Sequence, residues 1–429
     1  MNLEFNSTDI RLAQEFDAQD ALRRFRNEFV IRDPNLIYLD GNSLGRLPKR
    51  SVEFMRHAIE HEWGERLIRI WNDGWFSTPM TLGAKIAKII GAQADEVLVA
   101  DATSINLFRL ALAAVQARPG RSKIVSDVFN FPSDLYILQN IVDLLGKQHR
   151  LELIPSEDGI SISPQAVEQA IDEDTALVSL SHVAFKSAFM YDMSHVTSLA
   201  HQAGALVLWD LSHSVGAVPV DLGGCKADLA VGCTYKYLNG GPGSPAFLYV
   251  RGDLKSQLNP PIWGWFADQA PFAFDPEFAP AMDISRYRVS TPSMLSMKAI
   301  EPAVDLFLEA GLERLRLKSI RQTEYLIFLA EQWLYPLGFF LGSPRQPEQR
   351  GSHVSLRHPE GYRISQAMIA SKPPAVQVIP DFREPDNIRL GIASLYTTFT
   401  EIHQALDRMR TIIQDQIYER VSANRPTVT

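Results

Sequence analysis

The sequence predicts an α/β protein, with a mainly parallel sheet in a large domain and a smaller α+β domain towards the C-terminus. Short apolar runs alternate with helical segments from about residue 80 to residue 250. This alternation gives way to a proline- and aromatic-rich stretch over residues 259–280, followed by a long helical stretch. These changes predict an N-terminal segment over residues 1–60, a large domain over 61–300 and a small domain over 301–429.

Composition excludes several classes of protein. The chain has 429 residues, 46% hydrophobic and 21% charged, with a formal net charge of −8. This acidic balance, without any basic run, disfavours a nucleic-acid partner. The two cysteines, Cys225 and Cys233, are too few for a disulfide framework and form no zinc-binding pair, so no metal is expected. Residues 1–9 lack a signal-peptide pattern and no apolar window reaches membrane-spanning length, so we expect a cytoplasmic protein without membrane contact.

The N-terminal segment begins with a helical pattern over residues 7–29 and continues into a short strand over 36–39. The strand leads into a loop over residues 40–45, in which two glycines flank Asn42 and Ser43. Pro48 then favours the start of a new helix. A glycine loop most often serves as a turn alone, so this loop has little functional weight by itself.

In the large domain, helical segments separate several strand-like runs, which lie at residues 96–100, 123–128, 176–180, 205–210, 229–233 and 246–250. Such alternation predicts a sheet covered on both faces, with ligands beyond the carboxyl ends of its strands. Asp210 and Lys236 are therefore expected at the same edge. The small domain is expected to hold a helix over 296–334, strands over 353–357, 375–379 and 387–391, and a closing helix over 400–420.

Lys236 is the strongest catalytic candidate. It follows a short apolar strand and precedes a sharp turn at residues 240–243, which contains three glycines and a proline. A lysine partly removed from water at such a position has a nucleophilic amine, as a Schiff-base lysine requires. Most lysines are solvated surface groups, so the prediction depends on the residues that accompany this one. Lys186 competes for the role but has no glycine-rich flank.

The accompanying residues are those that pyridoxal phosphate requires: an acid for its ring nitrogen, donors for its phosphate and a wall for its ring. Asp210 ends a strand 26 positions before Lys236 and fits the first need, although an aspartate there also suits a helix cap or turn. Thr103 and Ser104 open a helix, where hydroxyls and backbone N–H groups bind an anion or simply cap the helix. Tyr235 is a further phosphate donor or a proton relay.

Two more segments complete the predicted cofactor site. Phe131 begins a loop after a strand and is suited to lie over the cofactor ring, although a buried loop phenylalanine is the commoner explanation. Asp134, three positions later, could accept a hydrogen bond or act on the ring nitrogen. His213 follows Asp210 by three positions and could orient its carboxylate, or simply be a satisfied core histidine.

Four motifs resemble those of kynureninases, in the same order and at similar separations: DGNSLG at 40–45, FPSD at 131–134, WDLSH at 209–213 and TYKYLNGGPGS at 234–244. The resemblance extends from about residue 38 to residue 395, and its last motif is the most specific. It implies the fold-type I architecture of pyridoxal phosphate enzymes. It also implies a homodimer with the active site at the subunit interface.

The resemblance implies a role for each matching residue. Lys236 would carry the cofactor, Asp210 would pair with its ring nitrogen, and Phe131 would stack on the ring. Trp265, in GWF at 264–266, would reach the phosphate of the partner subunit, and Thr291 stands where some members have asparagine. The other implied roles are phosphate binding by Thr103, Ser104 and Tyr235, further cofactor contacts by Asp134 and His213, and substrate binding by Arg389, Asn42, Ser43 and Trp71.

The implied activity is hydrolysis of kynurenine, or of its 3-hydroxy form, to anthranilate or 3-hydroxyanthranilate and alanine. A cysteine desulfurase-like enzyme or an aminotransferase of the same fold is an alternative. A desulfurase needs a mobile cysteine far downstream of the lysine, and neither Cys225 nor Cys233 qualifies. An inactive binding protein of this fold is the other alternative, but retention of Lys236, Asp210 and Arg389 disfavours it.

Overall fold

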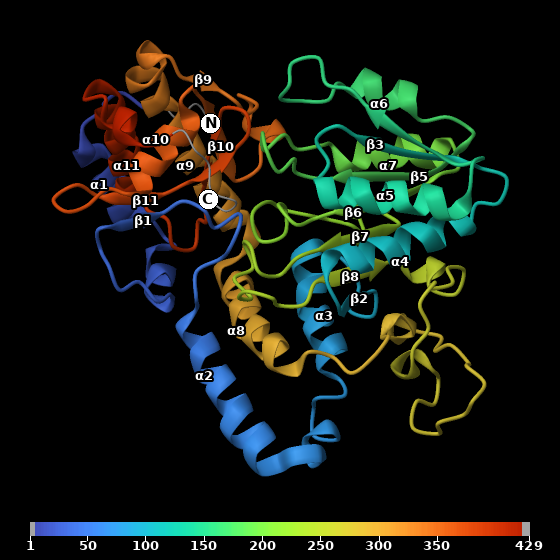
Figure 1. Ribbon diagram of the computed structural model, residues 1–429. Coiled ribbons are helices and arrows are strands. Elements are labelled where there is room, and N and C mark those ends of the chain that lie inside the picture. Colours follow the sequence, from blue (N-terminus) through green and yellow to red (C-terminus); the bar gives the residue numbers. More distant parts are fainter. Residues whose placement is uncertain (1–4, 423–429) are drawn as a thin grey trace.

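The computed structural model describes residues 5–422, and a seven-stranded sheet with helices on both faces is its largest unit (Figure 1). Four of its six strand pairings are parallel, which confirms a mainly parallel sheet. Across the sheet the strands are β2 (Val97–Val99), β8 (Phe247–Val250), β7 (Leu229–Gly232), β6 (Leu206–Asp210), β5 (Thr175–Ser181), β3 (Lys123–Asp127) and β4 (Arg150–Ile154).

Successive side chains of a strand point to opposite faces, so each strand serves two helical layers. In β6, Leu206 and Leu208 join one apolar core with residues of α4 (Thr103–Gln116) and α5 (Pro132–Leu145). Val207 and Trp209 join the other core. That second layer is formed by α3 (Thr78–Ile90), α6 (Pro164–Ala170) and α7 (Met193–Gln202).

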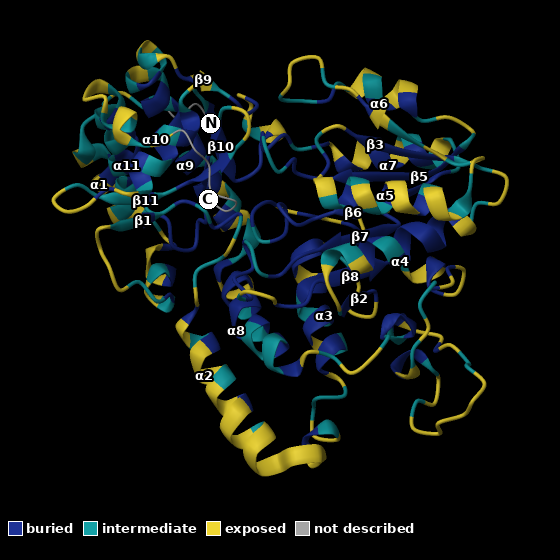
Figure 2. Cartoon of the chain, viewed as in Figure 1, coloured by how far each residue is buried: buried dark blue, intermediate teal, exposed yellow. Residues whose placement is uncertain are grey.

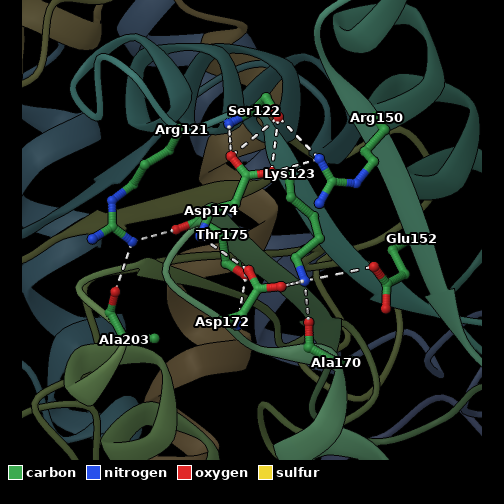
Figure 3. A network of polar contacts seen from close by, with 10 residues as sticks. All are labelled: Arg121, Ser122, Lys123, Arg150, Glu152, Ala170, Asp172, Asp174, Thr175 and Ala203. Carbon is green, nitrogen blue, oxygen red and sulfur yellow. Dashed lines mark hydrogen bonds and ion pairs between the residues drawn. The ribbon is translucent and has the colours of Figure 1, made fainter.

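A polar network links residues at the edge of the sheet formed by the amino ends of β3 and β5 (Figure 3). Lys123 is 2% exposed, and its Nζ donates to the Ala170 carbonyl and to Asp172, each at 2.7 Å. Glu152 of β4 lies 3.5 Å from the same nitrogen. The sequence pattern does not predict β4, because Arg150 and Glu152 interrupt its apolar character at this outer strand.

The smaller unit contains a four-stranded antiparallel sheet of β12 (Asp381–Arg383), β13 (Asn387–Gly391), β10 (His353–Arg357) and β9 (Phe340–Leu341). The expected strands at 353–357 and 387–391 have these bounds. The strand expected at 375–379 is shorter, β11 (Gln377–Ile379). It pairs in parallel with β1 (Leu36–Tyr38) in a separate two-stranded sheet.

The N-terminal segment packs mainly with this smaller unit. Ala13 of α1 (Ile10–Gln19) and Ile37 share a core with residues of α9 (Leu312–Trp333), α10 (Gly361–Ile369) and α11 (Phe399–Gln414). We propose on this basis that the residues before α2 (Lys49–His57) belong with the small domain.

The single helix expected over 296–334 is divided into two helices, α8 (Met294–Ala310) and α9. Gly311 separates them with a φ of +81°, a left-handed conformation that ends α8. Short helical segments lie at Arg23–Glu28, Ala58–Arg66, Leu67–Trp71, Gly252–Leu254, Trp265–Ala267, Ile284–Tyr287, Tyr335–Leu337, Pro347–Gln349 and Ile417–Arg420. Between residues 5 and 422, no helix is long and apolar enough to cross a membrane.

Candidate active site

The register of the large sheet brings Asp210 and Lys236 to one edge. Asp210, the last residue of β6, pairs with Val231 of the neighbouring parallel strand β7. The loop after β7 carries Lys236, whose Nζ lies 5.6 Å from the ring centre of Phe131 and 5.9 Å from that of Tyr235. Phe131 is placed there as the residue that precedes α5. The strand ends thus gather the lysine, the carboxylate and the aromatic wall.

The glycine turn and the N-terminal loop hold the backbone around Lys236. Gly240 donates its N–H to the Thr234 carbonyl at 2.8 Å. Gly45 donates to the Tyr235 carbonyl at 2.8 Å. A Cβ on Gly45 would lie 2.4 Å from the carbonyl oxygen of Lys236, so only glycine permits this approach. The loop of residues 40–45 therefore has a structural role at the lysine in addition to any role in binding.

Two buried carboxyl groups accompany the lysine. Asp210 accepts hydrogen bonds from the Ser212 N–H at 2.9 Å and the Ser212 hydroxyl at 2.6 Å. Burial raises its pKa, and the charge of Lys236 opposes that rise. Asp134 is 2% exposed, and its Oδ2 has no hydrogen-bond partner among the described residues. Burial and the nearby Asp210 raise the pKa of Asp134 well above its usual range.

His213 lies in the same buried region. Its Nε2 has no hydrogen-bond partner between residues 5 and 422. Burial, and then the charges of Lys236 and Arg389, lower the pKa of His213 well below its usual value, so the ring is neutral near pH 7. A neutral imidazole beside Asp210 and Lys236 is a hydrogen-bonding group without added charge.

A cavity of about 380 Å³ lies beside these residues at the start of α4. Thr103, Ser104, Tyr235 and Thr291 all line it, so the structure brings four predicted phosphate-end residues together. Arg288 lines it too, 4% exposed, with Nε and Nη2 lacking a partner among the described residues. The Arg288 guanidinium lies 4.5 Å and 4.6 Å from the ring centres of two phenylalanines, Phe76 and Phe266.

The residues present fit pyridoxal phosphate. The amino end of α4, the hydroxyls around the cavity and the unpartnered donors of Arg288 suit an anionic phosphate. The unpartnered oxygen of Asp134 and nitrogen of His213 are buried polar atoms that a bound polar ring would satisfy.

Arg389 is the centre of a second cluster. It is 1% exposed and donates to the Ser43 hydroxyl at 3.0 Å and to the Phe185 carbonyl at 2.5 Å. With its amide oxygen turned towards Arg389, Asn42 accepts from Nε and Nη2 at 3.2 Å. Asp381, opposite Arg389 in the register of β12 and β13, forms an ion pair with it. Three of the four predicted substrate-binding residues therefore lie together.

Trp71 and Trp265 lie behind Arg288, in an aromatic cluster around Phe266. The ring centres of Trp71 and Phe266 are 5.8 Å apart, and those of Trp265 and Phe266 are 3.9 Å apart. Trp265 is 38% exposed. Neither tryptophan lines the cavity beside Lys236 in this subunit.

Sequence reasoning missed four charged or polar residues of the site, of which three are buried and one, Asp40, is half-buried. Arg288 and Asp381 are described above. Asp40 has its pKa raised to about 6 by burial and by Asp381. His353 faces His213 with 5.9 Å between ring centres. The only sequence signal was their position in loops and strands that carry predicted site residues.

Comparisons with known proteins agree with this geometry. Residues 37–359 match the family model "Aminotransferase class-V", and residues 315–409 match "Kynureninase C-terminal domain". A kynureninase of Pseudomonas fluorescens is 44% identical over 402 residues, covering 92% of this chain and 94% of that protein. The chain belongs to the kynureninase family.

Solved structures similar to this kynureninase-family chain confirm the fold. The apo cysteine desulfurase of Thermococcus onnurineus NA1 has a TM-score of 0.76 at 18% identity, covering 90% of this chain and 100% of that one. A C-DES mutant with glycine covalently linked to its PLP cofactor has a TM-score of 0.75 at 18% identity, covering 88% of this chain and 97% of that one. Such low identities show the fold alone. Family membership identifies pyridoxal phosphate as the cofactor of this chain.

Proposed function

We propose that this protein is a pyridoxal phosphate-dependent kynureninase that hydrolyses the Cβ–Cγ bond of L-kynurenine, giving anthranilate and L-alanine in tryptophan catabolism. The 3-hydroxy substrate would give 3-hydroxyanthranilate. The observation that carries the proposal is the convergence of Lys236, Asp210 and the Arg389 cluster at one edge of the sheet in a chain of this family.

Bound at this site, pyridoxal phosphate supplies an electron sink for charge that develops on the substrate α-carbon. Lys236 would hold it covalently, Asp210 would keep its ring nitrogen protonated, and Phe131 would cover one ring face. Asp134 and His213 would complete the ring contacts. The phosphate would lie among Thr103, Ser104, Tyr235 and Thr291, with Trp265 of the partner subunit.

The protein's own groups would bind the substrate and move protons. Arg389, held by Asn42 and Ser43, would grip the α-carboxylate through its planar fork of donors. Lys236 Nζ, released when the substrate amine takes its place, would remove the proton from the α-carbon. Burial raises the pKa of Tyr235, so its hydroxyl stays protonated and able to donate. One water adds to the γ-carbonyl, and cleavage yields one carboxylic acid and one amino acid.

Assembly and location are part of the proposal. We propose a homodimer with its active sites at the interface, supported by exposed apolar residues in α2 and the helical segments after it. These residues are Val52, Phe54, Ile59, Trp63, Leu67 and Ile68. Figure 2 shows that α2 is largely exposed. A cytoplasmic location is consistent with two free thiols, at Cys225 and Cys233.

Release of anthranilate from kynurenine by the purified holoenzyme, followed by its fluorescence, tests the function. We expect wild type to release it and Lys236→Ala to release none, because no other group can replace the covalent anchor. Lys147→Ala is the matched control, an exposed lysine in the turn after α5 that should keep its activity. A wild type that only transaminates with a keto acid, or that is inert, would exclude the proposed reaction.

A further inference from the structure

His353 is a buried histidine whose ring has no hydrogen-bond partner in the part of the chain that the structure describes. It is the first residue of β10, 0% exposed, and pairs with Gly391 across the sheet. Within residues 5–422, neither Nδ1 nor Nε2 has a hydrogen-bond partner. Buried polar atoms in folded proteins are almost always paired, so two such nitrogens on one ring point to a group that binds there.

The surroundings of His353 belong to the active site. Its ring centre lies 5.9 Å from that of His213, whose Nε2 is also unpartnered within the described chain. Burial, and then the charges of Arg389 and Lys236, lower the pKa of His353 well below its usual value. The backbone of Phe185 lies close enough to raise the pKa of His353 slightly against these effects, but it does not have hydrogen-bonding geometry with either ring nitrogen. Ser355, two positions along β10, pairs with Arg389, so His353 and Arg389 lie diagonally on one face of the small sheet. His353 is therefore a neutral imidazole close to Arg389 and within electrostatic range of Lys236.

If the proposed function holds, His353 lies beside the amino-acid end of the substrate. The substrate amine would react beside Lys236, and its carboxylate would bind Arg389. Both groups are attached to the same α-carbon, so a ring packed against His213 and next to Arg389 in the sheet is expected near that carbon. The donors of Arg389 are already shared among Asn42, Ser43, Phe185 and Asp381. A carboxylate arriving there would accept a further hydrogen bond from another side.

We propose that His353 is a substrate-binding residue that donates a ring N–H to the α-carboxylate and, with Arg389, orients the α-carbon. A neutral imidazole offers one donor and one acceptor, and its donor nitrogen is the one that meets the carboxylate. The residue acts on the amino-acid end of the substrate, away from the aryl ring.

Equilibrium binding to the holoenzyme tests this placement without turnover. L-alanine carries the amine and the α-carboxylate, whereas anthranilate carries the aryl ring. Titrating each ligand while following the cofactor absorbance gives two dissociation constants. We expect His353→Leu to raise that of L-alanine about ten- to hundredfold, the value of a buried hydrogen bond to a charged group. The constant for anthranilate should stay within about twofold.

Two further variants distinguish a substrate-binding role of His353 from a structural one. His353→Gln keeps a neutral donor and should restore L-alanine binding to within about fivefold of wild type. His403→Gln removes another buried histidine of the small domain, one whose ring lies 5.0 Å from Trp333, and should leave binding unchanged. Because His353→Leu removes unpartnered polar atoms, the melting temperature of that variant should equal or exceed that of wild type.

The outcomes decide between binding and structure. Unchanged L-alanine binding in a folded His353→Leu variant overturns the proposal, as does an effect confined to anthranilate. Loss of folding in both His353 variants would mean that the ring is structural, and also overturns it. Failure of the proposed function is distinguishable, because wild type would then bind L-alanine yet release no anthranilate from kynurenine.

Discussion

Arg389 connects more of the predicted site than any other single residue. Its guanidinium is held by the loop of residues 40–45, the Phe185 carbonyl and Asp381. These contacts fix its plane before substrate arrives, which lowers the entropic cost of binding a carboxylate. The buried Asp381 also balances the charge of Arg389 when no carboxylate is bound.

Arg389→Lys should weaken substrate binding. Lysine presents a point charge where arginine presents a fork, so we expect KM for kynurenine to rise about ten- to hundredfold, equivalent to about 1.4–3 kcal/mol. Steady-state kinetics by anthranilate fluorescence measures the change. Arg383→Lys is the control, because Arg383 pairs with the same Asp381 but its side chain is 38% exposed. An equal rise in both variants would contradict a specific role for Arg389.

The sequence could predict those site residues that a local pattern marks, and not those that only burial marks. Asp210 ends an apolar strand and Lys236 closely follows another, and parallel strands align their carboxyl ends, so local pattern places them together. Arg288 and His353 give no such signal, since their importance comes from burial without a partner. Burial of a side chain is a property of the whole packing, which one sequence does not display.

Among the elements, β3 ends on a carboxyl group that supports the Phe131 loop. Asp127 is 1% exposed and accepts from the Tyr191 hydroxyl at 2.8 Å and the Phe129 N–H at 2.5 Å. Burial raises its pKa to about 6. Between about pH 4 and 6, the folded protein therefore holds a proton that the unfolded chain has released. The free energy of unfolding consequently falls as pH rises through this window, and the loss is complete above it.

Asp127→Asn should remove this dependence, because an amide has no proton to lose. Relative to wild type, the variant should gain up to about 3 kcal/mol between pH 4 and pH 7. Urea midpoints at both pH values measure the gain. Asp143→Asn, an exposed carboxyl of α5, controls for net charge and should show no comparable change. A constant difference between Asp127→Asn and wild type across the range would refute the assignment.

Element prediction succeeded where pattern and packing agree. The strands at 353–357 and 387–391 have the expected bounds, since polar and apolar side chains alternate along both with the period of a strand. The sequence did not predict β4, because an outer strand tolerates charged residues that interrupt its apolar pattern. The division of the long helix depends on the φ of Gly311, which a glycine in sequence permits but does not require.

At the scale of the whole molecule, one subunit does not bring all predicted residues together. Trp265 packs on Phe266 and is 38% exposed, and it does not line the cavity of its own subunit. Family resemblance assigns Trp265 to the phosphate of the partner subunit. An aromatic surface near it, including Trp263, Phe272 and Phe274 at 67%, 59% and 73% exposure, is large for a free monomer. A dimer would cover this surface and complete both sites.

Hybrid dimers test whether the sites are shared between subunits. Lys236→Ala should be inactive, and Trp265→Ala should have low activity at limiting cofactor. In a hybrid of the two, one site combines an intact Lys236 with an intact Trp265, while the other site lacks both. Random mixing of equal amounts makes half the dimers hybrids, so activity should recover to about a quarter of wild type. Activity equal to the mean of the two parent variants would show instead that each subunit builds its site alone.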